Sequence, residues 1–250
     1  MKMNLLIMLL LSILGACKGQ QGDLAFEAVV AKDSLNPTTY YDLEYVQIKA
    51  GNLPDSIRLA INQRVVNKCK SLIKGYSSLD PQDSLWKPLE QQTLQSVAMV
   101  FFEWARKEPD YLPFYDSLRV DTVFCSKQIV CFRFSNTLKT QLTKQLLAQY
   151  VTFDLKTAKI RSVYEDLAVS QRNLEDIIRP YLKESLQGNN PDALPDNLSF
   201  GSAAEMGITN EGLLVHFDEL NNKEGFADVT IPWAELKGKG ILKDSLIFNP

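Results

Sequence analysis

Residues 120–134 read Val-Asp-Thr-Val-Phe-Cys-Ser-Lys-Gln-Ile-Val-Cys-Phe-Arg-Phe, and this stretch decides the fold of the chain. Apolar and polar side chains alternate on both sides of a short polar turn at Ser126-Lys127. Such alternation is typical of β-strands, because successive side chains of a strand point to opposite faces. The stretch therefore predicts a hairpin with strands at 120–124 and 129–134.

Further strands are predicted on both sides of this hairpin. Residues 24–31 and 40–49 alternate in the same way and are separated by Asn36-Pro37. Residues 146–155 are rich in Val, Tyr and Phe, and a polar turn at 156–159 leads into Ile160. The remaining predicted strands lie around Phe200 and Ile208, at 213–217 after a turn at 210–212, and at 226–231, where Pro232 ends the strand.

Helical spacing appears in three blocks. The first begins at Pro54-Asp55-Ser56 and ends at Gly75, with Ile57, Ile61, Val65, Cys69 and Leu72 on one face. The second covers 85–107 and ends before Pro109; its predicted apolar stripe is Leu89, Val97, Val100, Phe101 and Trp104. The third covers 171–187, residues 188–195 form a loop by composition, and 233–236 form one helical turn. An aromatic cluster at Phe101, Phe102 and Trp104 could bind sugar, but core packing is favoured because it continues the stripe.

The order of these elements predicts the fold class. Helices that arrive in blocks, between strands joined by tight turns, favour α+β over a parallel α/β arrangement. We expect antiparallel sheets with helices packed on one face, in two small halves that share a core. The halves are assigned to residues 24–145 and 146–250.

Four segments resemble a known family. They are Tyr45–Cys69 with Ile61-Asn62 inside it, Tyr150–Thr157 with its Phe-Asp-Leu-x-Thr pattern, Gly207–Phe217 and Asp228–Leu236 with its Ile-Pro-aromatic-x-x-Leu pattern. In this order they are similar to the paired extracellular domain of unknown function in the lysozyme-sensing anti-sigma factor RsiV, which also occurs beside the catalytic domain of a peptidoglycan deacetylase. The resemblance implies an α+β fold and a non-catalytic, envelope-facing role that binds lysozyme or cell wall. The family often has a Gly-Gly-Ala-His loop between its halves, and residues 136–145 occupy that place in this chain. The anti-sigma factor also has a cytoplasmic segment and a spanning helix. Neither is recognised in this sequence, so sigma-factor control is not expected.

The first residues predict export and lipidation. Lys2 precedes an apolar run of 10 residues, Leu5–Leu14, which is too short for a spanning helix of about 20 residues and fits a signal peptide at 1–16. Leu14-Gly15-Ala16-Cys17 resembles the lipobox of bacterial lipoproteins, which implies a lipid on the Cys17 sulfur; the alternative is an ordinary secretory signal that carries a cysteine. Residues 17–23 then form a polar tether, and Lys18 in place of an aspartate favours the outer membrane of a Gram-negative bacterium.

Composition limits the partners. The chain is 45% hydrophobic, has a net charge of −3, and reaches −4 without Lys2, with 26 Lys and Arg against 30 Asp and Glu. Residues 17–250 can bury a sizeable core, and a mildly acidic protein without basic clusters is a poor nucleic-acid binder. The expected partners are therefore the membrane, through the Cys17 lipid, and a cell-wall polymer or a lysozyme-like protein.

Three cysteines follow Cys17. An odd number leaves at least one of Cys69, Cys125 and Cys131 unpaired within one chain. On one strand Cys125 and Cys131 would lie ~20 Å apart, and the turn would place Cys125 near Gln128 instead. A bridge from Cys69 to either strand cysteine stays open, although burial as small apolar residues is favoured. The lack of a Cys-x-x-Cys pair gives no support to a redox or zinc site.

Catalytic residues are hard to find in this sequence. His216 is the sole histidine, whereas a catalytic zinc is commonly held by several, so no metal or cofactor is predicted. A Ser-His-Asp triad would depend on His216, in the middle of a predicted strand, where a structural role is favoured. The acidic pairs Glu165-Asp166, Glu175-Asp176 and Asp218-Glu219 are interpreted as solvated surface.

The sequence thus predicts a lipid-anchored, non-catalytic envelope protein that binds or senses a cell-wall polymer or a protein such as lysozyme. Two alternatives remain: a structural or assembly lipoprotein with protein partners alone, and a glycan hydrolase that uses carboxylates. Cys17 is the single residue to which a specific role is assigned, as the site of lipidation.

Overall fold

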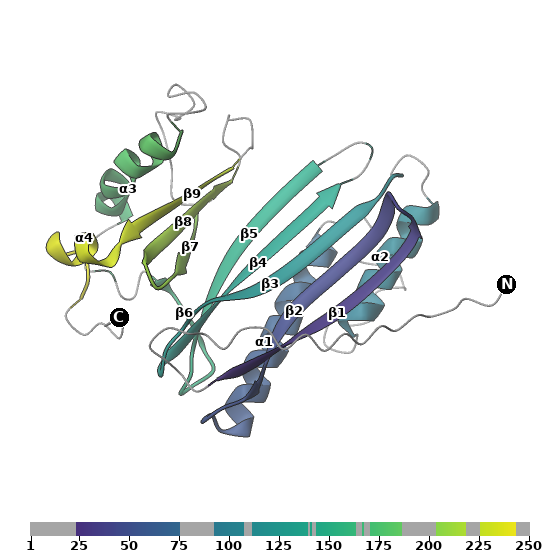
Figure 1. Cartoon of the computed structure of the whole chain (residues 1–250), viewed down its shortest axis with the longest axis horizontal. Coiled ribbons are helices and arrows are strands. Elements are labelled where there is room, and N and C mark those ends of the chain that lie inside the picture. The colour runs from purple at the N-terminus through teal and green to yellow at the C-terminus, as the bar shows by residue number, and fades with distance from the viewer. Residues whose placement is uncertain are drawn as a thin grey trace.

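The computed structural model confirms the predicted α+β class (Figure 1). It describes residues 24–75, 93–107, 112–139, 141, 144–163, 167, 171–186, 204–218 and 226–243. The strands within these residues are β1 Ala25–Asn36, β2 Thr39–Ala50, β3 Tyr115–Cys125, β4 Ile129–Lys139, β5 Lys144–Asp154, β6 Ile160–Arg161, β7 Ala204–Ile208, β8 Gly212–Asp218 and β9 Phe226–Pro232. The helices are α1 Asp55–Gly75, α2 Leu94–Lys107, α3 Gln171–Leu186 and α4 Trp233–Gly238.

Some sequence predictions fall outside the described residues. They are the signal peptide at 1–16, Cys17, the tether at 17–23, residues 85–92 of the second helix, the loop at 188–195 and the strand around Phe200. No helix of the described part of the chain is long and apolar enough to cross a membrane.

The larger sheet has the strand order β1-β2-β3-β4-β5-β6. The neighbours are antiparallel, as predicted, with the exception of β2 and β3, which run parallel from Tyr40 beside Tyr115 to Glu44 beside Arg119. A parallel pair needs a crossover of a dozen residues or more. Here α1 and α2 lie within the crossover from β2 to β3, so the sheet is mixed.

Helices α1 and α2 cover one face of this sheet, which we call the inner face (Figure 1). The predicted face of α1 is confirmed, because Ile61, Val65, Cys69 and Leu72 are buried and Ile57 packs against them. In α2 the buried residues are Leu94, Val97, Ala98 and Phe102, whereas Val100 is half-buried. Of the predicted stripe, Val97 is therefore confirmed and Val100 is only half-buried, whereas Ala98 and Phe102 were not predicted; Leu89 and the side chains of Phe101 and Trp104 lie outside the described part.

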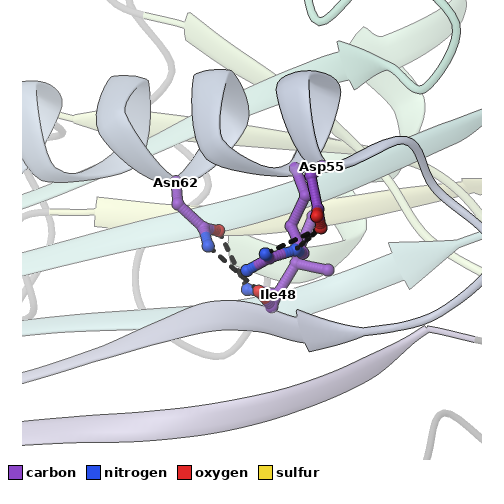
Figure 2. A network of polar contacts seen from close by, with 4 residues as sticks. Ile48, Asp55 and Asn62 are labelled. Atoms are coloured by element: carbon purple, nitrogen blue, oxygen red, sulfur yellow. Dashed lines mark hydrogen bonds and ion pairs between the residues drawn. The ribbon is translucent and has the colours of Figure 1, made fainter.

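Helix α1 is fixed to β2 by one side-chain amide (Figure 2). The backbone N–H of Ile48 donates to Oδ1 of Asn62 at 2.9 Å, and Nδ2 of Asn62 donates to the carbonyl oxygen of Ile48 at 3.0 Å. The hydrogen-bonded pairing of β2 with β3 has already ended at Glu44. Asn62 thus gives both backbone groups of Ile48 a partner and sets the position of the helix on the sheet.

The smaller sheet has the order β7-β8-β9 and is antiparallel throughout. The predicted turn at 210–212 is confirmed: Oγ1 of Thr209 accepts the backbone N–H of Gly212 at 3.1 Å and donates to the Gly212 carbonyl oxygen at 2.9 Å. Leu174, Ile178 and Leu182 of α3 are buried in the same apolar cluster as this sheet. The predicted third helix and final helical turn are therefore confirmed as α3 and α4.

Two apolar clusters lie on opposite faces of the larger sheet. Val130, Phe132 and Phe134 of β4 belong to the cluster under α1 and α2, whereas Ile129 and Cys131 belong to the cluster with the smaller sheet. β3 and β5 likewise have side chains in both. β5 lies in the larger sheet beside β4, and the boundary assigned between residues 145 and 146 falls within β5.

Cys69, Cys125 and Cys131 are buried and unbridged. Cys69 and Cys125 belong to the inner cluster, and Cys131 to the cluster on the other face. Burial raises the pKa of the Cys69 thiol to about 12, so that thiol stays protonated at neutral pH. The interpretation of the three cysteines as small buried apolar residues is confirmed.

Candidate functional site: the outer face of the larger sheet

The face of the larger sheet opposite α1 and α2, the outer face, has a covered end and an open end. Strand register fixes which residues share this face: Tyr40 is beside Tyr115, Tyr115 beside Lys139, and Lys139 beside Lys144. The same register continues along the strands to Arg133 beside Tyr150 and to Cys131 beside Thr152. Because side chains alternate, all of these residues point away from the two crossover helices.

The smaller sheet packs on the covered end. Ile129, Cys131 and Tyr150 are buried there with residues of β7, β8 and β9. The approach is close at Gly207 of β7, where an added Cβ would come within 2.7 Å of Cγ of the Tyr150 ring. The thiol of Cys131 is hydrogen-bonded to the Thr152 side chain and to the backbone of Ile208. A glycine and a buried thiol therefore let the two sheets meet.

A polar cluster, which we call the seam, lies where the covered end stops. Nδ1 of His216 in β8 lies 2.6 Å from Oδ1 of Asp228 in β9, and a guanidinium nitrogen of Arg133 in β4 lies 3.6 Å from Oδ2 of Asp228. The Arg133 guanidinium also lies 5.9 Å from the centre of the Tyr150 ring. Two sheets far apart in sequence are thus joined through one carboxylate.

Asp228 is ionised in this arrangement. Burial alone would raise its pKa, but the hydrogen bond from His216 and the charges of His216 and Arg133 outweigh that effect and lower the pKa. An ionised carboxylate accepts hydrogen bonds, so Nδ1 of His216 carries the proton that it donates. The His216 side chain is 4% exposed, which leaves a substrate little access to the ring.

The open end of the outer face carries aromatic and charged side chains. Tyr40 and Tyr115 are direct neighbours with ring centres 4.6 Å apart and an angle of 49° between the ring planes. Lys32 of β1 pairs with Oδ2 of Asp42 at 2.9 Å, while Oδ1 of Asp42 is buried without a hydrogen-bond partner. The other members of this end are Val30, Ser34, Glu44, Ser117, Arg119, Ser135, Thr137, Lys139, Lys144, Leu146 and Ala148.

Positive charge dominates the open end. It holds four cations, Lys32, Arg119, Lys139 and Lys144, against two carboxylates, Asp42 and Glu44, a local balance of +2 in a chain of −3. Arg119, Lys139 and Lys144 are exposed and take part in no ion pair within the described residues. The arrangement can hold an anionic ligand by charge.

The structure places some residues that the sequence analysis weighed for chemistry. His216 lies within a strand, as predicted, and joins Asp228 in the seam. Asp176 is exposed on α3, whereas Glu165, Asp166 and Glu219, and the side chains of Glu175 and Asp218, lie outside the described part. Within that part, no group of three or more His, Cys, Asp or Glu residues could hold a metal ion.

One titratable residue of the larger sheet could not be singled out among the sequence candidates. Asp116 of β3 is 2% exposed on the inner face, its Oδ1 has no hydrogen-bond partner, and burial raises its pKa to about 7. Nearby on the same face, Oδ1 and Nδ2 of Asn136 also lack partners. Alternation offered a signal, because Asp116 shares the parity of Leu118 and Val120.

The fold is that of solved proteins of the DUF3298 family, a domain of unknown function. Crystal structures from Bacteroides fragilis and from Pseudomonas aeruginosa both match with a TM-score of 0.59. The first is 10% identical and covers 90% of this chain and 96% of its own, and the second is 12% identical and covers 88% and 95%. At this identity the likeness concerns the fold alone.

The other comparisons add no relative. No protein-family model matches the chain, and no curated protein matches it. The resemblance to a domain of unknown function is therefore supported at the level of the fold.

Proposed function

We propose that the chain is a lipid-anchored, non-catalytic protein of the bacterial cell envelope that binds or senses a cell-wall polymer or a protein such as lysozyme. The lipobox-like Leu14–Cys17 supports the anchor, and Lys18 supports the outer membrane. The likeness to DUF3298 crystal structures agrees with the resemblance of the sequence to an extracellular domain.

The observation that carries the binding role is the open end of the outer face. Its cations Arg119, Lys139 and Lys144 are exposed, and its charge is opposite to that of the chain as a whole. Unpaired exposed cations are rarely needed for stability, because surface ion pairs contribute little. Their grouping beside two tyrosines supports recognition of a partner.

The lack of catalysis is proposed from the seam. His216 is buried and its Nδ1 is held by Asp228, which itself contacts Arg133. These contacts give the histidine a structural role in holding β8, β9 and β4 together. Asp116 has a raised pKa but is enclosed on the inner face, away from the open end.

The anchor is tested by metabolic labelling with palmitate. The wild-type chain should be labelled and should fractionate with membranes, whereas Cys17→Ala should be unlabelled and released or uncleaved. Equal labelling and location of the two proteins would contradict lipidation at Cys17.

The binding role is tested with full-length protein in detergent. We expect it to co-sediment with purified peptidoglycan sacculi or to capture lysozyme on beads, with an unrelated lipoprotein as the control. Incubation with sacculi should release no soluble glycan fragments. If the protein bound neither sacculi nor lysozyme, the proposal would be contradicted. Released glycan fragments would indicate a hydrolase.

A further inference from the structure

We propose that the open end of the outer face binds the glycan strands of the cell wall, a polymer of amino sugars whose lactyl groups are free carboxylates wherever the stem peptide has been removed. Tyr40 and Tyr115 form the surface on which a sugar ring packs, and Lys139 and Lys144 contact its carboxylate. The inference rests on the proposed function and names both the ligand class and the surface within it.

The tyrosines provide the first argument. They begin the parallel pairing of β2 and β3, their ring centres lie 4.6 Å apart, and both rings remain partly exposed. Buried tyrosines usually fill a core, whereas these lie on the face that α1 and α2 do not cover. Paired, rigid rings offer an apolar surface at low entropic cost, which suits the C–H face of a sugar.

The lysines provide the second argument. Lys139 and Lys144 are directly opposite each other on β4 and β5, and Lys139 is also opposite Tyr115. Like charges directly opposite each other destabilise a sheet, and no described carboxylate compensates this pair. An anionic ligand between the two ammonium groups would turn that repulsion into attraction, with the tyrosine rings alongside.

Asp42 provides the third argument. Its Oδ2 is held by Lys32 and its buried Oδ1 has no partner, although the side chain is 15% exposed. Asp42 lies two residues after Tyr40 on the same face of β2 and is paired with Ser117 of β3. Because Oδ1 is buried, the exposed part of this carboxylate is at Oδ2, which can accept a further hydrogen bond from a ligand hydroxyl or acetamido N–H.

The composition of the surface favours a glycan over a protein. The centre of a protein interface is enriched in large apolar side chains. Here the exposed large apolar residues, Val30 at 38% and Leu146 at 37%, lie on β1 and β5, whereas β4 places the half-buried Ser135 and Thr137 on this face. A surface of hydroxyl groups, tyrosines and cations fits a polar acidic chain.

The test compares full-length variants in detergent by co-sedimentation with purified sacculi at ~0.1 M salt. The variants are Lys139→Glu with Lys144→Glu, Tyr115→Leu and Tyr115→Phe. The matched control, Arg64→Glu with Lys127→Glu, makes the same charge change at exposed positions on α1 and in the β3–β4 turn. Circular dichroism and thermal unfolding confirm that each variant is folded.

We expect the lysine double variant to bind about tenfold or more weakly, and Tyr115→Leu about three- to tenfold more weakly. Tyr115→Phe, which keeps the ring, and the charge control should bind within about twofold of the wild type. Half-molar salt should weaken the wild type and leave the lysine variant little changed, because salt screens exposed charges. Sacculi from which the stem peptides have been removed should bind more tightly than intact ones, because removal frees a carboxylate on each stripped sugar. Weaker binding would overturn the glycan as the ligand.

Each contrary result has a distinct meaning. Two results would show that this surface does not bind the glycan, while leaving the envelope-binding role intact. One is an equal loss of sacculus binding in the lysine variant and the charge control. The other is wild-type binding by both the lysine variant and Tyr115→Leu. Capture of lysozyme without binding to sacculi would overturn the glycan as ligand but keep the protein form of the proposed function. Binding to neither bait would remove both.

Discussion

The inner and outer faces of the larger sheet differ in how much water and how many ion-pair partners they give to their charged groups. On the inner face Asp116 and Asn136 are almost fully buried and have atoms without partners. On the outer face the seam pairs Asp228 with His216 and Arg133, and the open end leaves its cations in solvent. Each of these outer-face charges has an ion-pair partner or water, and even Asp42, whose Oδ1 accepts no hydrogen bond, is paired with Lys32, whereas Asp116 is paired with no cation within the described residues.

The two carboxyl groups should respond to pH in opposite directions. The folded state raises the pKa of Asp116, so folding favours its proton, and stability falls as pH rises from about 4 to about 7. The folded state lowers the pKa of Asp228, so that contribution is present above the usual carboxyl pKa near 4 and is lost as pH falls below it. The chain should therefore lose stability at both ends of this pH range, through Asp116 of β3 as pH rises and through Asp228 of β9 as pH falls.

The largest expected effect comes from breaking the contact between the two sheets. Gly207→Ala would drive a methyl group into the Tyr150 ring, at a cost of about 3–5 kcal/mol in the free energy of unfolding. Chemical denaturation measures the loss, and Gly238→Ala, whose new methyl group meets nothing within 4 Å, is the control. Adding Tyr150→Ala should recover part of the loss; no loss in the single variant would mean that the sheets do not meet at this glycine.

The next effect sharpens the comparison of charges. Asp116→Asn removes the buried acid and should stabilise the chain at pH 8 by on the order of 2–4 kcal/mol, with little change at pH 4. Denaturation midpoints of both proteins across pH 4–8 measure the effect. A constant difference over this range would show that Asp116 does not titrate on the inner face.

A third prediction concerns what holds the inner face closed. Asn62→Ala removes both hydrogen bonds to the backbone of Ile48 and should cost about 1–3 kcal/mol. Arg64→Ala, two residues along α1 and exposed, should change stability by less than about 0.5 kcal/mol. Equal stability of the two variants would show that α1 is held by apolar packing alone.

The smallest expected effect lies in the seam. Asp228→Asn should lose less than about 1 kcal/mol at pH 7, because the Arg133 pair is partly exposed. Below pH 4 the stability of the variant should fall less steeply than that of the wild type, because the variant has no carboxylate to protonate at this position. Thermal unfolding of both proteins at a series of pH values tests this. The same decrease in unfolding temperature below pH 4 in both would contradict the ionised state assigned to Asp228.

Local patterns predicted much of this fold because they depend on neighbouring residues alone. The alternation in 120–134 gave the hairpin, and the turn before Gly212 and the buried face of α1 followed from similar spacing. The parallel pairing of β2 with β3 could not be predicted, since it depends on where a long crossover brings the chain back. The stripe of α2 omitted Ala98 and the buried Phe102, because helical spacing alone does not fix how wide the buried face is.

The candidate site was much less predictable than the fold. Residues 136–145 were compared with a loop, whereas Asn136 to Lys139 and Lys144 continue β4 and β5, so the lysine pair was missed. Asn62 was noted as part of a motif, but its bonds to Ile48 exist only after the helix has packed on the sheet. A site made by register between distant strands leaves no local pattern.

The side chains of β3, β4 and β5 alternate between the two apolar clusters, and this gives the chain a mechanical property. Ile129 and Cys131 belong to one cluster, and Val130 and Phe132 belong to the other. Because the same strand contributes to both, unfolding of either cluster should destabilise the other. A fragment that ended at residue 161 would retain all six strands yet expose a strip of apolar surface to water. We expect such a fragment to aggregate, and the whole chain to melt in one step.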